Sequence, residues 1–108
     1  MPNLPVATDR TFASEVLDAA NAVVDFWGEG CPACGWLEPV VEKLGQAYAG
    51  QVKVVSADVG EAGETAASLG ITAIPTVVFF KNGQEVSRIV GAHPLGRYTA
   101  EIAARFGV

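Results

Sequence analysis

Residues 23–34, VVDFWGEGCPAC, decide how this chain folds and where its chemistry lies. The segment 23–27 is apolar apart from Asp25, which predicts a buried central strand. Cys31 and Cys34 follow at once, and they are the only two cysteines of the chain. A pair with this spacing at the start of a helix suits reversible disulfide chemistry better than structural cross-linking. The motif therefore indicates thiol-disulfide exchange.

Composition limits the remaining function classes. The chain has 108 residues, half of them hydrophobic, which is enough for one core, so we expect a single domain over residues 1–108. A formal charge of −5, with seven scattered Lys and Arg residues, argues against nucleic-acid or membrane partners. The longest apolar stretch, 71–80, is too short to span a bilayer, and residues 1–5 do not resemble a charged leader. We therefore expect a cytoplasmic protein.

Runs of β-favouring residues between turn signals predict five strands. Asn82-Gly83 tolerates positive φ at both positions and predicts a tight antiparallel hairpin between the last two strands. The earlier strands alternate with helices, which favours parallel crossovers. The expected fold is α/β, a mixed five-stranded sheet with helices on both faces. The strands are expected at residues 4–7, 23–27, 52–58, 76–80 and 85–90.

Capping residues and helical periodicity predict four helices. The first should be capped by Thr8-Asp9 and should turn Phe12, Val16 and Leu17 inward. Pro39 lies within the apolar stripe of the second and is expected to kink that helix rather than end it. The four helices are expected after Thr8-Asp9, from Cys31 to Gly50, over residues 61–69, and between Pro94 and Gly107. Gly70 is expected to end the third of them.

The residues quoted so far resemble the thioredoxin family over essentially the whole chain. Cys-x-x-Cys alone is a moderate signal, but together with Ile-Pro-Thr before the hairpin it is strong. The resemblance implies a thioredoxin fold, reduction of disulfides in protein substrates, a thioredoxin reductase as electron donor, a monomer, and no cofactor or metal. The matching landmarks are residues 25–27, Cys31 and Cys34, Pro39, residues 70–71, 74–76 and 81–83, and Gly91-Ala92.

The local environment of Cys31 favours its thiolate, the form that attacks disulfides. With Cys31 at the helix N-cap, the unpaired N–H groups of Ala33 and Cys34 should point at its sulfur, and the helix dipole adds to the effect. Pro32 at the first helical position loses no hydrogen bond. We expect Cys31 to attack and Cys34 to resolve. Two alternatives remain: inert buried or bridged thiols, or a metal site shared between two chains, since only His93 could join the cysteines.

Asp25 stands in the middle of an apolar strand, where a carboxylate is costly to bury without a task. Burial should raise its pKa and make it a proton acceptor for Cys34 through a water molecule. The alternative is an aspartate turned to solvent at the strand end. Many thioredoxins place a lysine near this carboxylate, whereas the matching residue here is Ser56.

The resemblance also implies a shallow apolar surface that binds substrates around the disulfide. The Ile74-Pro75 bond would be cis, which turns the Ile74 backbone outward to pair with an extended peptide. Gly91 would let that peptide come close, although it could equally be a strand-end turn. The expected substrate-binding residues are Trp27, Gly30, Pro32, Ala33, Ile74, Pro75, Gly91 and Ala92.

Some residues depart from the family pattern. Gly30 replaces the usual tryptophan before the first cysteine, and Gly28 should give the loop more freedom. Trp36 is expected to pack against the helix stripe rather than to contact partners, and His93 to be a solvated surface residue.

The position of the proline in the motif bears on the redox potential. The usual motif, Cys-Gly-Pro-Cys, lacks the second N–H that Ala33 retains here, so we expect a more oxidising disulfide. The same fold could also work as an oxidant or isomerase, or as a non-enzymatic interaction module that uses the apolar surface.

Overall fold

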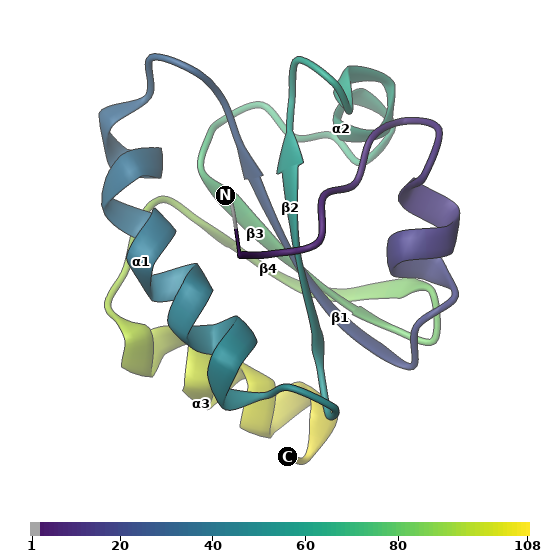
Figure 1. Cartoon of the computed structure of the whole chain (residues 1–108), viewed down its shortest axis with the longest axis vertical. Coiled ribbons are helices and arrows are strands. Elements are labelled where there is room, and N and C mark those ends of the chain that lie inside the picture. The colour runs from purple at the N-terminus through teal and green to yellow at the C-terminus, as the bar shows by residue number, and fades with distance from the viewer. Residues whose placement is uncertain (1–2) are drawn as a thin grey trace.

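A mixed four-stranded sheet forms the centre of the molecule, with helices on both of its faces (Figure 1). The computed structural model describes residues 3–108. Strand order is β2-β1-β3-β4, with β1 parallel to β2 and antiparallel to β3, and β4 antiparallel to β3. The elements are the π-helix η1 (Ala13–Leu17), β1 (Asn21–Trp27), α1 (Pro32–Ala47), β2 (Lys53–Asp58), α2 (Gly63–Ser68), β3 (Thr76–Lys81), β4 (Gln84–Val90) and α3 (Leu95–Phe106). The predicted mixed sheet with helices on both faces is confirmed.

The segment expected as a fifth strand does pair with β2, but only over a single parallel bridge between Val6 and Ser56. Ser56 N donates to the carbonyl of Pro5, and Ala7 N donates to the carbonyl of Ser56, both at 2.9 Å. Pro5 has no N–H to give, which limits how far the ladder can extend. The count of named strands is therefore four rather than five.

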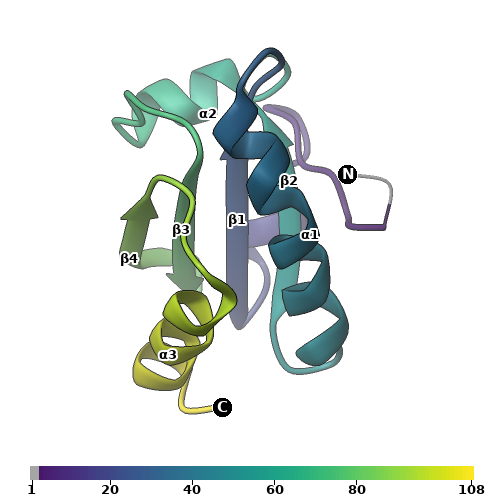
Figure 2. The same cartoon turned by 90° about the vertical axis from the view of Figure 1, so that its left-hand side faces the viewer.

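Each face of the sheet covers its own apolar cluster. Figure 2 shows α1 and α3 together on one face, where Leu37, Leu44 and Ile102 pack against Val23 and Phe79. On the opposite face, η1 and α2 enclose a second cluster that contains Phe12, Val16, Val24, Phe26 and Phe80. Because both faces are covered, the inner residues of β1 are all buried, as the near-continuous apolar run predicted.

The first helix differs from its prediction. Phe12 occupies the N-cap of η1 and makes no side-chain cap, so Thr8-Asp9 does not start this helix. Asp9 instead caps α2, where its carboxylate accepts from Thr65 N at 2.9 Å and Thr65 Oγ1 at 2.8 Å. These bonds from Thr65 lower the pKa of Asp9. Leu17, expected inside, is exposed, because a five-residue helix presents only one short face to the core.

The hairpin follows its prediction, and the second helix does not end at Pro39. Helix α1 has Cys31 at its N-cap and continues through Pro39 to Ala47. Asn82 and Gly83 both have positive φ, of 50° and 80°, and join β3 to β4 as a tight turn. The described residues contain no helix long and apolar enough to cross a membrane.

Candidate active site

The two cysteines lie at the N-terminus of α1, just beyond the end of β1. They form a disulfide with a Cα–Cα distance of 5.3 Å. Cys31 is partly exposed, whereas Cys34, inside the first turn, has only 4% of its surface exposed. An incoming group can therefore reach the sulfur of Cys31 more easily than that of Cys34.

One of the two predicted backbone donors reaches Cys31. Cys34 N donates to Cys31 Sγ at 3.2 Å, as expected when an N-cap side chain accepts from the N–H of the third helical residue. The bond expected from Ala33 N is not among the hydrogen bonds of residues 3–108 in this disulfide form, so that part of the prediction is wrong here. Of these two N–H groups, only that of Cys34 is hydrogen-bonded to the sulfur in the described structure, in which the ring is closed.

Asp25 is fully buried at the centre of β1, and neither carboxylate oxygen has a hydrogen-bond partner in the part of the chain that the structure describes. Desolvation, with a smaller contribution from the nearby Glu38 carboxylate, raises its pKa from 3.8 to about 7. Ser56 stands beside Asp25 in the parallel register, but its hydroxyl accepts from Trp27 Nε1 at 2.7 Å. The expected burial is confirmed, and the carboxylate has no compensating partner in the described part of the chain.

The sequence prediction did not include Glu38. Four residues after Cys34, it lies on the same face of α1 as that cysteine. Both residues line a cavity of about 200 Å³ whose other walls are Trp27, residues 28–31 and Gly35. The i, i+4 spacing was a readable signal that Glu38 belongs to the site.

The loop before β3 faces the disulfide. Its Ile74-Pro75 peptide bond is cis, and Ile74 O lies 3.8 Å from Cys31 Sγ. Gly28 lies against the same loop, because a Cβ on Gly28 would stand 2.7 Å from Ile74 Cδ1. A side chain at Gly28 would therefore require the Ile74 side chain to shift.

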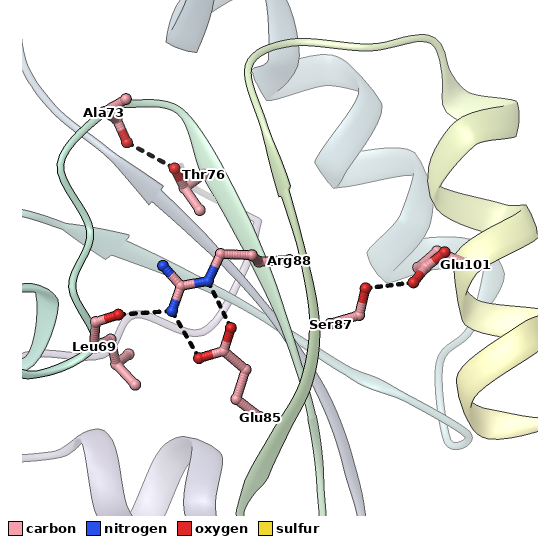
Figure 3. Close-up of polar contacts among 7 residues, drawn as sticks. All are labelled: Leu69, Ala73, Thr76, Glu85, Ser87, Arg88 and Glu101. Carbon is pink, nitrogen blue, oxygen red and sulfur yellow. Dashed lines mark hydrogen bonds and ion pairs between the residues drawn. The ribbon is translucent and has the colours of Figure 1, made fainter.

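Hydrogen bonds hold the segment that carries Ile74 and Pro75 near both of its ends (Figure 3). Arg88 on β4 binds Glu85 and donates through Nη2 to Leu69 O at 2.6 Å. At the other end, Thr76 Oγ1 donates to Ala73 O at 2.7 Å. The neighbouring contact between Ser87 and Glu101 ties β4 to α3.

Gly91 lies beside the proline loop. Its N–H donates to Pro75 O at 2.8 Å, and its φ of +88° is one that glycine adopts readily. Ala92 follows it and is exposed. Gly91 is thus both a strand-end turn and a neighbour of the disulfide surface, so the two interpretations of this residue are compatible.

The comparison with family models agrees with this geometry. The model described as Thioredoxin matches residues 3–104, nearly the whole chain. The chain belongs to the thioredoxin family. Its disulfide, buried aspartate and proline loop lie where the resemblance to that family placed them, and the function of the family is thiol-disulfide oxidoreduction.

Individual thioredoxins are similar along most of their length. Thioredoxin 1 of Nostoc is 44% identical over 88 residues, which cover 81% of this chain and 82% of the relative. The thioredoxin of Synechocystis is 43% identical over 95 residues, 87% of this chain and 89% of the relative. That of Chlorobaculum is 38% identical over 102 residues, 94% of each.

Two residues give this thioredoxin-family site its own surface. Gly30, where the family usually has tryptophan, has a φ of +74° and open space around it. Trp36 is 79% exposed, so the expectation that it packs against the helix stripe is wrong. An exposed tryptophan is available for contact with a partner.

His93, the third possible metal ligand beside the two cysteines, lies on the surface. His93 is exposed, as expected, but its Nε2 also lies 2.9 Å from Val90 O. Across residues 3–108, no group of three or more His, Cys, Asp or Glu side chains is arranged to hold a metal ion.

Proposed function

We propose that this protein reduces disulfide bonds in protein substrates through a Cys31/Cys34 dithiol cycle. The observation that carries the proposal is the N-cap disulfide, in which the sulfur of the partly exposed Cys31 accepts a hydrogen bond from Cys34 N. The same N–H would favour a thiolate at Cys31, because hydrogen bonds to a charged sulfur stabilise the charge. Cys31 is then the nucleophile and Cys34 the resolving thiol.

The cycle has two exchange steps. In the first, the Cys31 thiolate attacks a substrate sulfur, a mixed disulfide forms, and the other substrate sulfur leaves as a thiolate and takes a proton from solvent. In the second, Cys34 gives its proton to Asp25 through a water, and its thiolate attacks Cys31 Sγ. The Cys31–Cys34 bond forms and the second substrate thiolate leaves. The substrate gains two electrons, and the protein loses two.

Asp25 suits the role of proton acceptor in the second step. A pKa of about 7 lets the carboxylate both take and release a proton near neutral pH. Within residues 3–108, the carboxylate has no hydrogen-bond partner that would compete for this role. Below its pKa, Asp25 is protonated and cannot accept, so the resolving step should slow as the pH falls through about 7.

The substrate should bind over the surface that surrounds the disulfide. Ile74 O already lies beside Cys31, so an extended substrate segment can pair with this backbone as an added strand. Gly91 leaves space for that segment. The proposed contact residues are Trp27, Gly30, Pro32, Ala33, Ile74, Pro75, Gly91 and Ala92.

Trapping of mixed disulfides tests the assignment of the two cysteines. Cys34→Ser should accumulate mixed disulfides with a protein substrate, because the attacking thiol remains and the resolving thiol is lost. Cys31→Ser is the matched control and should trap nothing. Non-reducing gels followed by mass spectrometry would reveal the adducts, and the reverse pattern would refute the assignment.

Cellular context is part of the same proposal. We assign residues 1–108 to one thioredoxin domain that acts as a monomer in the cytoplasm and takes electrons from a thioredoxin reductase. The family match over residues 3–104 supports this assignment. The rival role, a disulfide oxidant or isomerase on the same fold, predicts a markedly less negative reduction potential, which equilibration with glutathione would measure.

A further inference from the structure

Tyr98 carries a buried hydroxyl close to the active site. It lies in the first turn of α3 and has no exposed surface. A phenol in such a position needs hydrogen-bond partners, because an unpaired buried hydroxyl is costly. The Tyr98 hydroxyl donates to Gly91 O at 3.2 Å and accepts from His93 N at 3.1 Å. Both partners are backbone groups of the short segment between β4 and α3.

That segment, residues 91–93, continues into the surface around the disulfide. Gly91 N donates to Pro75 O at 2.8 Å, and the neighbouring Ile74 carbonyl lies 3.8 Å from Cys31 Sγ. A chain of contacts therefore links the Tyr98 hydroxyl to the reactive sulfur through two backbone segments. Apart from the Cys31 sulfur, the Tyr98 hydroxyl is the one side-chain group in this chain of contacts, so it is the step that a substitution can remove.

The 91–93 segment has no regular secondary structure of its own to fix it. Gly91 at a φ of +88° could adopt many other conformations once released. The His93 ring packs edge-on against the Tyr98 ring, with centroids 6.4 Å apart, so Tyr98 holds the segment by its ring as well as by its hydroxyl. Loss of the hydroxyl would leave Gly91 O and His93 N without this partner.

We propose that Tyr98 is a positioning residue for protein substrates, whose hydroxyl holds residues 91–93 in the conformation that receives the polypeptide beside a substrate disulfide. The proposal rests on the function proposed above, because it assigns this segment to substrate contact. Small disulfides, which do not extend over residues 91–93, should not depend on Tyr98.

Tyr98→Phe removes the hydroxyl and leaves the ring. Reduction of insulin by dithiothreitol with the variant as catalyst should show a KM for insulin raised about 3- to 10-fold, as expected for one or two lost hydrogen bonds, with kcat changed less than about 2-fold. Reduction of hydroxyethyl disulfide should keep its wild-type rate. Amide hydrogen exchange at His93 should become faster, while exchange in the strands stays slow.

Matched variants separate the hydroxyl from other effects. Tyr48→Phe removes the hydroxyl of the only other tyrosine, at the far end of α1, and should leave both reactions unchanged. His93→Ala keeps the N–H that Tyr98 binds and should raise the KM for insulin less than Tyr98→Phe does.

Three outcomes would overturn the proposal. They are an unchanged KM for insulin in Tyr98→Phe, an equal loss of activity on insulin and on the small disulfide, and unchanged exchange at His93. Failure of the proposed function would look different, because wild-type protein would then not reduce insulin and Cys34→Ser would trap no substrate.

Discussion

Replacing Asp25 by asparagine should stabilise the folded protein, and by more as the pH rises. The carboxylate is fully buried and has no hydrogen-bond partner among the described residues, and its pKa is raised to about 7 from 3.8, first by desolvation. A raised pKa means that the folded state holds the proton more tightly than the unfolded state. Stability from this group is therefore highest at low pH and is lost as the pH rises toward the folded pKa of about 7.

The size of the effect follows from the same two pKa values. They differ by about 3, and one pKa unit corresponds to about 1.4 kcal/mol, so the charged carboxylate costs the fold about 4 kcal/mol above pH 8. By the same relation, the stability advantage of Asp25→Asn should increase by about 2 kcal/mol between pH 5.5 and pH 9, mostly below pH 7. Asparagine is polar but uncharged, so this pH-dependent difference isolates the charge.

Urea unfolding of the oxidised protein at several pH values measures this difference. In the disulfide form neither cysteine titrates, so the thiols do not contribute to the pH dependence. Asp18→Asn is the matched control, because it removes an exposed carboxylate and should show no comparable trend. A constant difference between Asp25→Asn and wild type across this pH range would refute the buried-charge reasoning. Destabilisation at every pH would mean that Asp25 accepts structural hydrogen bonds.

Trp36→Ala should raise the KM for insulin about 5-fold or more, since exposed tryptophans at contact sites often contribute more than 1 kcal/mol; its free energy of unfolding should change by less than about 0.5 kcal/mol. A KM for insulin equal to that of the wild-type protein would show that Trp36 is not part of the contact surface. Glu38→Gln should lower the pKa of Asp25 by removing a like charge, and should therefore lower the pH midpoint of mixed-disulfide resolution. An unchanged midpoint would contradict this prediction. Glu42→Gln is the control, because Glu42 lies one helical turn away and outside the cavity. Exchanging the motif residues, Pro32→Gly with Ala33→Pro, should make the reduction potential more negative by a few tens of mV, measured against glutathione. No change would show that the Ala33 N–H does not reach the thiolate either.

Local sequence signals, those between residues close together in the chain, were sufficient to predict most of the fold. The apolar run before the cysteines specified a buried central strand, and Asn82-Gly83 specified the hairpin. The disulfide could be predicted because both of its residues, their spacing and the helix start lie within four positions. Each of these features depends on neighbours in sequence, which is why periodicity and turn chemistry revealed them.

Features that depend on packing between distant segments could not be obtained in this way. Asp9 looked like a cap for the helix beside it, yet it caps a helix that begins more than fifty residues later. Tyr98 lies on the buried face of α3 with Ile102 and Phe106, and nothing local in the sequence indicates that its hydroxyl meets the segment after β4. The wrong prediction that Trp36 packs against the helix stripe has a different cause. Trp36 lies about 100° around the helix from Leu37, so its exposure could have been predicted from the buried stripe itself.

Ser56 illustrates how one residue on a neighbouring strand determines the behaviour of Asp25. A lysine near this carboxylate, as many thioredoxins have, would favour the charged form and lower the pKa of Asp25. Ser56 brings no charge, and its hydroxyl is bound to Trp27 Nε1, so it does not hydrogen-bond the carboxylate either. Ser56 therefore offsets none of the desolvation of Asp25, whose pKa is raised to about 7. The same absence of compensation that reduces the stability of the fold above pH 7 leaves a carboxylate that can accept and release a proton in the pH range where thiol exchange takes place.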